Sequence, residues 1–278
     1  MKIDSHHHFW NYSVEEYGWI GDGMEVLKRD FAASDLYQEI STKGIDGVVS
    51  VQARQSVEET RWLCGIAEQE EIVKGVVGWL PLADPDVESE VEKWSANETL
   101  KAVRHVVQDE PDDAFILGEE FNRGVALLQK YGLVYDILIF AKHLKNTIQF
   151  VDQHPGQSFV LDHIAKPTIA RNQFDASWQE GIVELAKRDN VTCKFSGVVT
   201  EVRDASWSIE TIRPYWDIAL EAFGSERLMY GSDWPVCLLK SEYSRWVDTI
   251  SELSSTLSDT EQEQFWGTNS IRAYGLAN

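Results

Sequence analysis

Three consecutive histidines near the N-terminus, His6, His7 and His8, are the first residues whose types and spacing could perform chemistry. A purification tag usually has more histidines in Gly- and Ser-rich surroundings, whereas this tract follows MKIDS and precedes two aromatic residues. Alternate side chains of a β-strand share a face, so His6 and His8 are predicted to point one way together with Asp4, and His7 the other. A pair of imidazoles on one face could bind a metal ion or exchange protons.

Two further residues could complete a site with this pair. His163 lies in the apolar segment SFVLDHI, and Asp233 lies in the turn-like sequence GSDWP after another apolar segment. A His-x-His pair alone is a weak indication of a metal or catalytic site. The indication becomes much stronger if a third histidine and an aspartate converge on the same place. The question is therefore whether these segments meet in the fold.

Other polar and aromatic residues are candidates for contacts with a substrate. Arg104 lies in an otherwise apolar segment, where an unpaired buried charge is costly, so we expect it to reach a carboxylate or a ligand oxygen. Trp10 and Trp234 directly follow candidate site residues and are predicted to form an apolar wall against a ring-shaped substrate. His143 opens a predicted helix, and a surface role and a site role are equally good interpretations of it. The remaining candidates are Gln52, Arg54 and Lys166.

Eight short apolar segments are predicted to be the β-strands that position these residues. They cover residues 1–4, 47–53, 72–80, 100–107, 133–140, 158–164, 191–198 and 227–235. Helical patterns between them cover residues 57–70, 86–95, 121–132, 143–156, 177–190 and 213–224. The alternation predicts one (β/α)8 TIM-barrel domain over residues 1–278, in which functional side chains lie at the C-terminal ends of the strands. A doubly wound open sheet is less favoured, because no G-x-G-x-x-G sequence follows the first strand.

The composition excludes several classes of partner. The chain has 278 residues, of which 43% are apolar, and a net charge of −21, so we expect no binding to nucleic acid or to an anionic membrane. No leader and no apolar run approaching about 18 residues is present, which favours a cytoplasmic protein. Cys64, Cys193 and Cys237 are odd in number and lack C-x-x-C spacing, so they are predicted to be unpaired thiols. The oligomeric state stays open, and a homo-oligomer is one alternative.

Several stretches together resemble the sugar-lactonase group of the amidohydrolase-related proteins. They are IDSHHHFW, VQARQSVEETRWL, KAVRHVVQDEPD, LVYDILIFAKHL, LDHIAKP and MYGSDWPV. That group includes L-fuconolactonase-like and L-rhamnonolactonase-like enzymes and is related to 2-pyrone-4,6-dicarboxylate lactonase. The resemblance runs from residue 3 to about residue 275, with the motifs in the correct order. It implies a barrel of the metal-dependent-hydrolase type, hydrolysis of a cyclic ester, and a small sugar lactone as the binding partner.

The resemblance also implies roles for individual residues. The superfamily's strand-one His-x-His falls on His6 and His8, its strand-six histidine on His163, and its strand-eight aspartate on Asp233. The lysine or glutamate that bridges two metals in binuclear members is absent, and Arg104 lies near its place, which disfavours a binuclear centre. Two alternatives stay open. One zinc ion could be held by these three histidines and the aspartate, or the enzyme could work without a metal, as the pyrone lactonase does.

These roles predict a mechanism in which Asp233 is the general base for the water that attacks the lactone carbonyl. A metal or the protonated imidazoles themselves would stabilise the oxyanion, and Gln52, Arg54, Arg104 and Lys166 would bind the sugar hydroxyls. One alternative is a zinc-dependent, non-hydrolytic decarboxylase resembling the aminocarboxymuconate type. Another is a non-catalytic sugar-binding barrel, which the presence of both Asp233 and His163 disfavours.

Overall fold

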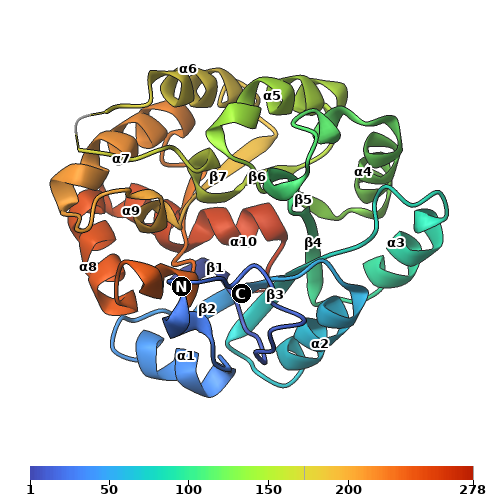
Figure 1. Ribbon diagram of the computed structural model, residues 1–278, viewed down its shortest axis with the longest axis horizontal. Helices are drawn as coiled ribbons and strands as arrows, with labels where there is room; N and C mark the ends of the chain where they lie inside the picture. The colour runs from blue at the N-terminus through green and yellow to red at the C-terminus, as the bar shows by residue number, and fades with distance from the viewer. Residues whose placement is uncertain (172, 278) are drawn as a thin grey trace.

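Eight parallel strands form the centre of the molecule, and helices surround them (Figure 1). The computed structural model describes residues 1–171 and 173–277. The strands pair in chain order and are β1 Ile3–His7, β2 Gly47–Val51, β3 Val73–Gly78, β4 Leu100–His105, β5 Val134–Ile137, β6 Phe159–Leu161, β7 Val191–Phe195 and β8 Leu228–Tyr230. Each lies within or overlaps one of the predicted apolar segments, so the prediction of a (β/α)8 barrel is confirmed.

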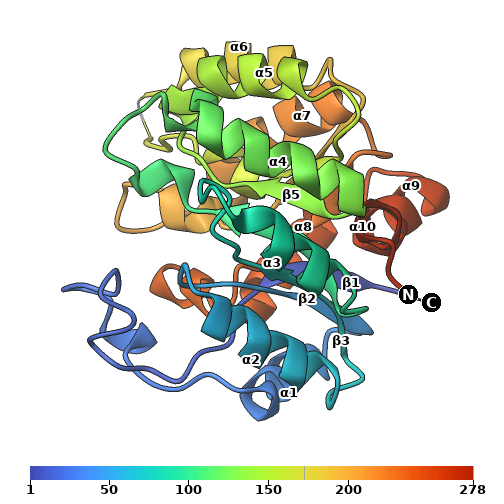
Figure 2. The ribbon, with the colours of Figure 1, turned by 90° about the vertical axis from the view of Figure 1, so that its right-hand side faces the viewer.

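The main helices follow the strands in alternation and lie on the outside of the barrel. They are α1 Ala33–Ile40, α2 Val57–Ala67, α3 Val87–Ser95, α4 Glu119–Tyr131, α5 Leu144–Gln153, α6 Ala176–Leu185, α7 Ile209–Phe223 and α8 Tyr243–Ser254. The predicted helical patterns correspond to α2–α7. Two short helices follow, α9 Asp259–Glu263 and α10 Asn269–Tyr274. Figure 2 shows α9 and α10 at the same end of the barrel as both chain termini, opposite the extended loop that follows β1.

Apolar side chains fill the two regions on either side of the strands. The inner cluster consists of Ile3, Val49, Val51, Val77, Ala102, Val134, Val160 and Met229 from the strands, with Tyr274 and Leu276 from the C-terminal segment. A much larger cluster packs between the strands and the outer helices. Because both faces of each strand are buried, the strands show continuous apolar runs instead of strict alternation. The C-terminal segment closes one end of the barrel interior. The polar residues lie at the other end of the barrel.

Backbone hydrogen bonds between β1 and the segment after β8 complete the barrel. The amide of His8 donates to the carbonyl of Trp234 at 2.7 Å, and the amide of Asp233 donates to the carbonyl of His6 at 2.7 Å. Closure of the barrel therefore places Asp233 beside the histidine pair, although more than two hundred residues separate them in the sequence.

Strand β1 departs from the alternation that the sequence predicts. Between Asp4 and His7 its register against β2 shifts by one residue, so β1 contains a bulge there. Asp4 consequently faces the outer helices, where its carboxylate accepts a hydrogen bond from the hydroxyl of Tyr243 at 3.1 Å. The expectation that Asp4 shares a face with His6 and His8 is therefore wrong. The two histidines themselves face the barrel interior.

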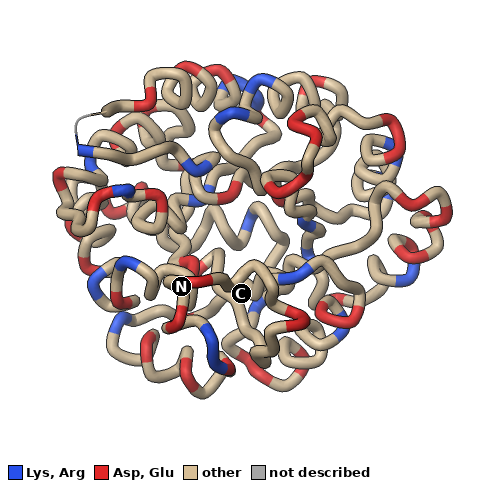
Figure 3. Tube along the Cα trace, viewed as in Figure 1, with Lys and Arg blue, Asp and Glu red and all other residues tan. Residues whose placement is uncertain are grey.

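The three cysteines are unpaired thiols, as predicted, and the acidic residues lie on the outside of the barrel. Acidic residues are spread over the outer helices on all sides of the molecule (Figure 3). Cys64, Cys193 and Cys237 are buried and form no disulfide in the described part of the chain. Over residues 1–171 and 173–277, no helix combines the length and the apolar character needed to cross a membrane.

Candidate active site

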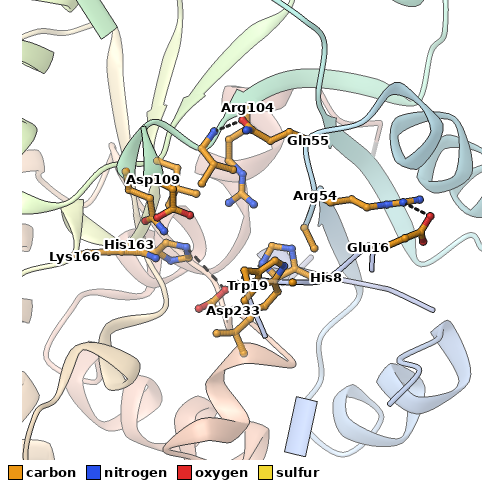
Figure 4. A pocket seen from close by; sticks show the side chains of 16 residues that line it. His8, Glu16, Trp19, Arg54, Gln55, Arg104, Asp109, His163, Lys166 and Asp233 are labelled. Carbon is orange, nitrogen blue, oxygen red and sulfur yellow. Dashed lines mark hydrogen bonds and ion pairs between the residues drawn. The ribbon is translucent and has the colours of Figure 1, made fainter. Parts of the chain in front are cut away.

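A cavity of about 370 Å³ opens among the loops that follow the C-terminal ends of the strands (Figure 4). This volume is within the range of small-molecule binding sites. Six of the predicted site residues line it, namely His8, Arg54, Arg104, His163, Lys166 and Asp233. Its charged lining residues are three cations, Arg54, Arg104 and Lys166, and three anions, Glu16, Asp109 and Asp233.

The four residues predicted to form the catalytic centre lie together at the base of this cavity. Asp233 Oδ1 lies 3.3 Å from His8 Nε2, 3.8 Å from His6 Nε2 and 3.9 Å from His163 Nε2. All four side chains are buried. The structure thus joins one carboxylate and three imidazoles from β1 and the residue after it, the turn after β6 and the turn after β8.

Hydrogen bonds at the far nitrogens orient two of these imidazoles. His8 Nδ1 lies 2.7 Å from the carbonyl oxygen of Val51, and a carbonyl can only accept, so Nδ1 carries the proton and donates. His163 Nδ1 lies 2.9 Å from the hydroxyl of Ser196. These contacts direct both Nε2 atoms toward Asp233, as outer partners do around metal-binding and catalytic histidines.

The turn that carries His163 has an unusual backbone. Four consecutive residues, from His163 to Lys166, have φ values of 54°, 47°, 61° and 48°, and Asp233 has a φ of 59°. Left-handed conformation costs about 1–2 kcal/mol for each residue that is not glycine. The surrounding structure holds the turn, and the indole of Trp178 donates a hydrogen bond to the carbonyl of Ile164 at 2.6 Å. Strain of this kind clusters at functional sites, and here it orients three residues of the cavity wall.

The protonation states follow from burial and from the neighbouring charges. Burial lowers the pKa of His163 to about 4, against the opposing effect of Asp233, and it lowers the pKa of His6 well below the ordinary value. Burial acts to raise the pKa of Asp233, but His163, His8 and Lys166 lower it, and the net pKa lies below the ordinary value. At neutral pH Asp233 is therefore ionised, and His6 and His163 are neutral. A neutral imidazole cannot stabilise an oxyanion as an imidazolium ion does. The expectation that protonated imidazoles stabilise the oxyanion is therefore corrected for these two residues.

The same atoms form a donor set for one divalent cation. The donor atoms of His6, His8 and Asp233 lie within 4.8 Å of one another. Ligand atoms about 2.0–2.2 Å from a tetrahedral zinc ion lie about 3.3–3.6 Å apart, close to the 3.3 Å and 3.8 Å measured from Asp233 Oδ1 to His8 and His6. Neutral imidazole and carboxylate are also the ligands that zinc prefers, so the residues fit the ion.

A second group of possible metal ligands consists of His6, Asp162 and His163. Its carboxylate is already paired with two cationic side chains of the protein. Lys194 Nζ lies 3.0 Å from Asp162 Oδ1, and Arg104 Nη1 donates to Asp162 Oδ2 at 2.9 Å. This occupancy agrees with the expectation that a binuclear centre is disfavoured.

Lys194, which pairs with Asp136, is the main residue that the sequence analysis missed. Lys194 lies on β7 and is fully buried, with its ammonium 2.7 Å from Asp136 Oδ2. A signal was available, because Lys194 interrupts the apolar segment VTCKF just as Arg104 interrupts its own. The cost of an unpaired buried charge applies equally to both.

The apolar wall of the cavity differs from the prediction. Trp10 and Trp234 are buried and lie outside the cavity wall. The indole of Trp10 donates to the carbonyl of Arg29 at 2.9 Å, and the ring of Trp234 packs edge-on against Phe31. Trp19, in the loop after β1, lines the cavity instead and is 39% exposed.

Two other predicted substrate contacts are also placed elsewhere. His143 is buried, and its Nε2 lies 3.2 Å from Asp113 Oδ1, outside the cavity wall. Gln52 is buried, and its side-chain amide donates to the carbonyl of Arg104 at 3.2 Å. Gln52 therefore supports Arg104 and does not line the cavity. Arg54 does line it, and pairs with Glu16 at 2.6 Å.

Comparison with known proteins agrees with this architecture. The model of the family described as Amidohydrolase matches residues 3–276. L-fucono-1,5-lactonase of Burkholderia multivorans is 39% identical over 289 aligned residues, which cover 99% of this chain and 96% of that protein. L-fucono-1,5-lactonase of Burkholderia ambifaria is 31% identical, with coverage of 99% and 96%. A crystal structure of an amidohydrolase from Burkholderia multivorans with bound Zn is 38% identical, with a TM-score of 0.95 over the whole of both chains.

Proposed function

The chain belongs to the amidohydrolase family, and from this premise we propose that it is a lactonase that hydrolyses the ring ester of a sugar lactone. The observation that carries the proposal is the ionised Asp233 carboxylate facing three imidazoles at the base of the cavity. The full-length similarity to two L-fucono-1,5-lactonases supports this substrate class.

The charges of the cavity favour a neutral substrate over an acid. Its wall has three cationic and three anionic side chains, and two of the cations already have partners. Arg54 pairs with Glu16 at 2.6 Å, and Arg104 pairs with Asp162 at 2.9 Å. A dianionic substrate would have to displace these pairs, whereas a neutral lactone would not. This observation favours the lactonase over the decarboxylase of unsaturated acids.

Asp233 is positioned to move the proton of the reaction. Its carboxylate takes a proton from the water that attacks the lactone carbonyl, and a tetrahedral intermediate forms. The bond between the former carbonyl carbon and the ring oxygen then breaks, and the ring oxygen receives the proton back from Asp233. General-base catalysis by one carboxylate contributes about 10²–10⁴-fold to the rate. The product is an open-chain hydroxy acid.

Two cationic side chains of the wall could stabilise the negative charge that develops on the carbonyl oxygen. Arg104 and Lys166 line the same cavity as Asp233, and fixed donors aimed at an oxyanion contribute about 10²–10³-fold. One zinc ion held by His6, His8, His163 and Asp233 would polarise the carbonyl and make the attacking water more acidic. Trp19 supplies the apolar face for the sugar ring, and Arg54 with Glu16 binds hydroxyl groups at the rim.

A screen of sugar lactones tests the proposal directly. Aldono-1,4- and aldono-1,5-lactones, with L-fucono-1,5-lactone first, are mixed with the protein and a pH indicator, because each hydrolysis releases a proton. We expect rapid acidification with at least one of them. A parallel assay measures carbon dioxide release from unsaturated carboxylic acids. Silence across all lactones, or decarboxylation without lactone hydrolysis, would contradict the proposal.

A further inference from the structure

The loop after β1 supplies one side of the cavity wall. Glu16, Gly18 and Trp19 line the cavity, whereas Tyr17, which lies between them in the chain, does not. These three lining residues are exposed, but the side chain of Tyr17 is only 2% exposed. Tyr17 therefore points into the protein and is placed to hold the exposed residues on either side of it.

The hydroxyl of Tyr17 donates a hydrogen bond at 3.2 Å to Oε1 of Glu59, a fully buried carboxylate in α2. The other oxygen of Glu59 accepts from the backbone amides of Ala53 at 3.0 Å and Arg54 at 2.8 Å. These two amides belong to the loop after β2, and both residues line the cavity, whereas Glu59 does not. One buried carboxylate thus connects two loops of the cavity wall through Tyr17.

Other contacts of the same segment are more exposed or less directional. Glu16 pairs with Arg54 at 2.6 Å (Figure 4), but its side chain is 50% exposed, and ion pairs this exposed contribute little. The rings of Tyr17 and Trp19 both pack on Trp10, with centroid distances of 5.8 Å and 5.7 Å. A buried hydrogen bond to a charged group contributes more than an exposed ion pair, so the bond from Tyr17 is the principal polar link of this segment to the barrel.

We propose that Tyr17 is a positioning residue, which holds Glu16 and Trp19 in the cavity wall through its hydrogen bond to Glu59. Its effect on catalysis rests on the proposed lactonase function, in which Trp19 and Glu16 contact the sugar. The link between the two loops does not depend on any substrate. Because Tyr17 touches neither Asp233 nor the histidines around it, its role is to favour substrate binding and not the chemical step.

The variant Tyr17→Phe tests this role, because it removes the hydroxyl and keeps the ring that packs on Trp10. Rates are measured at pH 8, above the Glu59 pKa of about 7, and corrected for spontaneous hydrolysis. We expect KM for the lactone to rise about tenfold, a factor that the loss of a hydrogen bond to a charged group can produce. The value of kcat should stay within about threefold, because uniform binding is lost. A role in stability alone would lower the melting temperature and leave the KM of the folded enzyme unchanged.

A second tyrosine provides the matched control. Tyr37 also donates to a glutamate, Glu70, at 3.4 Å, but it is 40% exposed and lies outside the cavity wall. We expect Tyr37→Phe to keep the wild-type KM. Glu59→Gln, which removes the charge of the acceptor, should raise KM in the same direction as Tyr17→Phe by a smaller factor, and it decides the outcome if Tyr17→Phe does not fold.

Hydrogen exchange of the backbone amides supplies a test that needs no substrate. The amide of Tyr17 donates to the carbonyl of Ser13 at 3.0 Å, and that of Ile20 to the carbonyl of Tyr17 at 2.9 Å. In Tyr17→Phe both amides should exchange at least about fivefold faster, while those of the strands stay protected. A wild-type KM in Tyr17→Phe, an equal rise in Tyr37→Phe, or unchanged exchange in Tyr17→Phe overturns the proposal. If the wild type hydrolyses no lactone, the proposed function fails, while exchange still tests the role of Tyr17.

Discussion

The carboxylate of Asp233 shows how strongly single residues here depend on their neighbours. Burial alone would raise the pKa of this group and remove its charge, but nearby His163, His8 and Lys166 keep it ionised. The same burial keeps His163 and His6 neutral, so that one anion faces neutral nitrogen donors. This combination suits a general base, and it also suits a cation ligand set.

Replacement of Asp233 tests this assignment at the residue scale. Asparagine has nearly the same shape and tolerates the left-handed backbone of position 233, with its φ of 59°, so Asp233→Asn should fold normally. We expect kcat/KM on the lactone to fall about 10²–10⁴-fold, because the base is lost. Asp248→Asn, at an exposed aspartate of α8, is the control with unchanged activity. Near-native turnover by a folded Asp233→Asn would rule out Asp233 as the base.

At the element scale, the loops that leave the strands are packed tightly enough to fix the site. Gly197, directly after β7, has a φ of 62°, and a Cβ there would lie 2.6 Å from His163 Nδ1 and 2.9 Å from Asp233 Oδ2. Strand β7 can therefore approach the two site residues only because this position has no side chain.

Two glycine variants separate this close approach from backbone strain. Gly132, at the end of α4, also has a positive φ of 73°, but a Cβ there would meet no atom within 4 Å. Gly197→Ala and Gly132→Ala should both lose about 1–2 kcal/mol of stability from the left-handed conformation. Only Gly197→Ala should also lose activity, by at least about tenfold, because His163 and Asp233 must shift. Equal kcat in the two variants would show that the packing of β7 does not position the site.

Glu59, in the first turn of α2, joins the loops after β1 and β2 and makes their stability depend on pH. Its Oε2 accepts hydrogen bonds from the amides of Ala53 at 3.0 Å and Arg54 at 2.8 Å, and its Oε1 accepts one from the hydroxyl of Tyr17 at 3.2 Å. Burial raises the pKa of Glu59 to about 7 from 4.5, although Arg54 and these hydrogen bonds act to lower it. Between these two values the folded state binds more protons than the unfolded state, so stability falls as pH rises.

Thermal unfolding as a function of pH measures the effect of Glu59. We expect the melting temperature of the wild type to fall more steeply from pH 5 to pH 8 than that of Glu59→Gln, which cannot ionise. The difference should be on the order of 3 kcal/mol of unfolding free energy across this range. Glu58→Gln, at an exposed neighbour in the same helix, should keep the wild-type slope. Parallel slopes for wild type and Glu59→Gln would contradict the raised pKa.

At the scale of the whole molecule, a bound cation would connect the first strand to the last turns of the barrel. A ligand that binds only the folded state stabilises it by about 2.7 kcal/mol when its concentration is 100 times Kd. We expect the purified protein to contain about one equivalent of zinc, and chelation to lower its melting temperature by several degrees. His8→Asn should lack both the metal and the response to chelator. His105→Asn, at a histidine outside the cavity wall, should retain both. Two equivalents of tightly bound metal in the wild type would contradict the single donor set.

The sequence by itself determined the barrel and four residues at the centre of its site. Eight apolar runs separated by helical patterns leave few ways to bury both faces of every strand, and a closed parallel barrel is the one found. Because the strands are parallel and the barrel is closed, all of their C-terminal ends lie at the same end of the barrel. His6, His8, His163 and Asp233 could therefore be placed together from chain order alone, and in the structure the three imidazoles lie within 3.9 Å of Asp233 Oδ1.

Only the tertiary structure decided how the other side chains point. The bulge in β1 turns Asp4 outward, and the path of the loop after β1 buries Trp10 while it places Trp19 in the cavity wall. Lys194 pairs with Asp136 on β5 and with Asp162 directly after β6. Local patterns show which residues form a strand, because burial and backbone geometry repeat along the chain. Bulges, loop paths and the pairing of buried charges depend on contacts between residues far apart in sequence, which no local pattern contains.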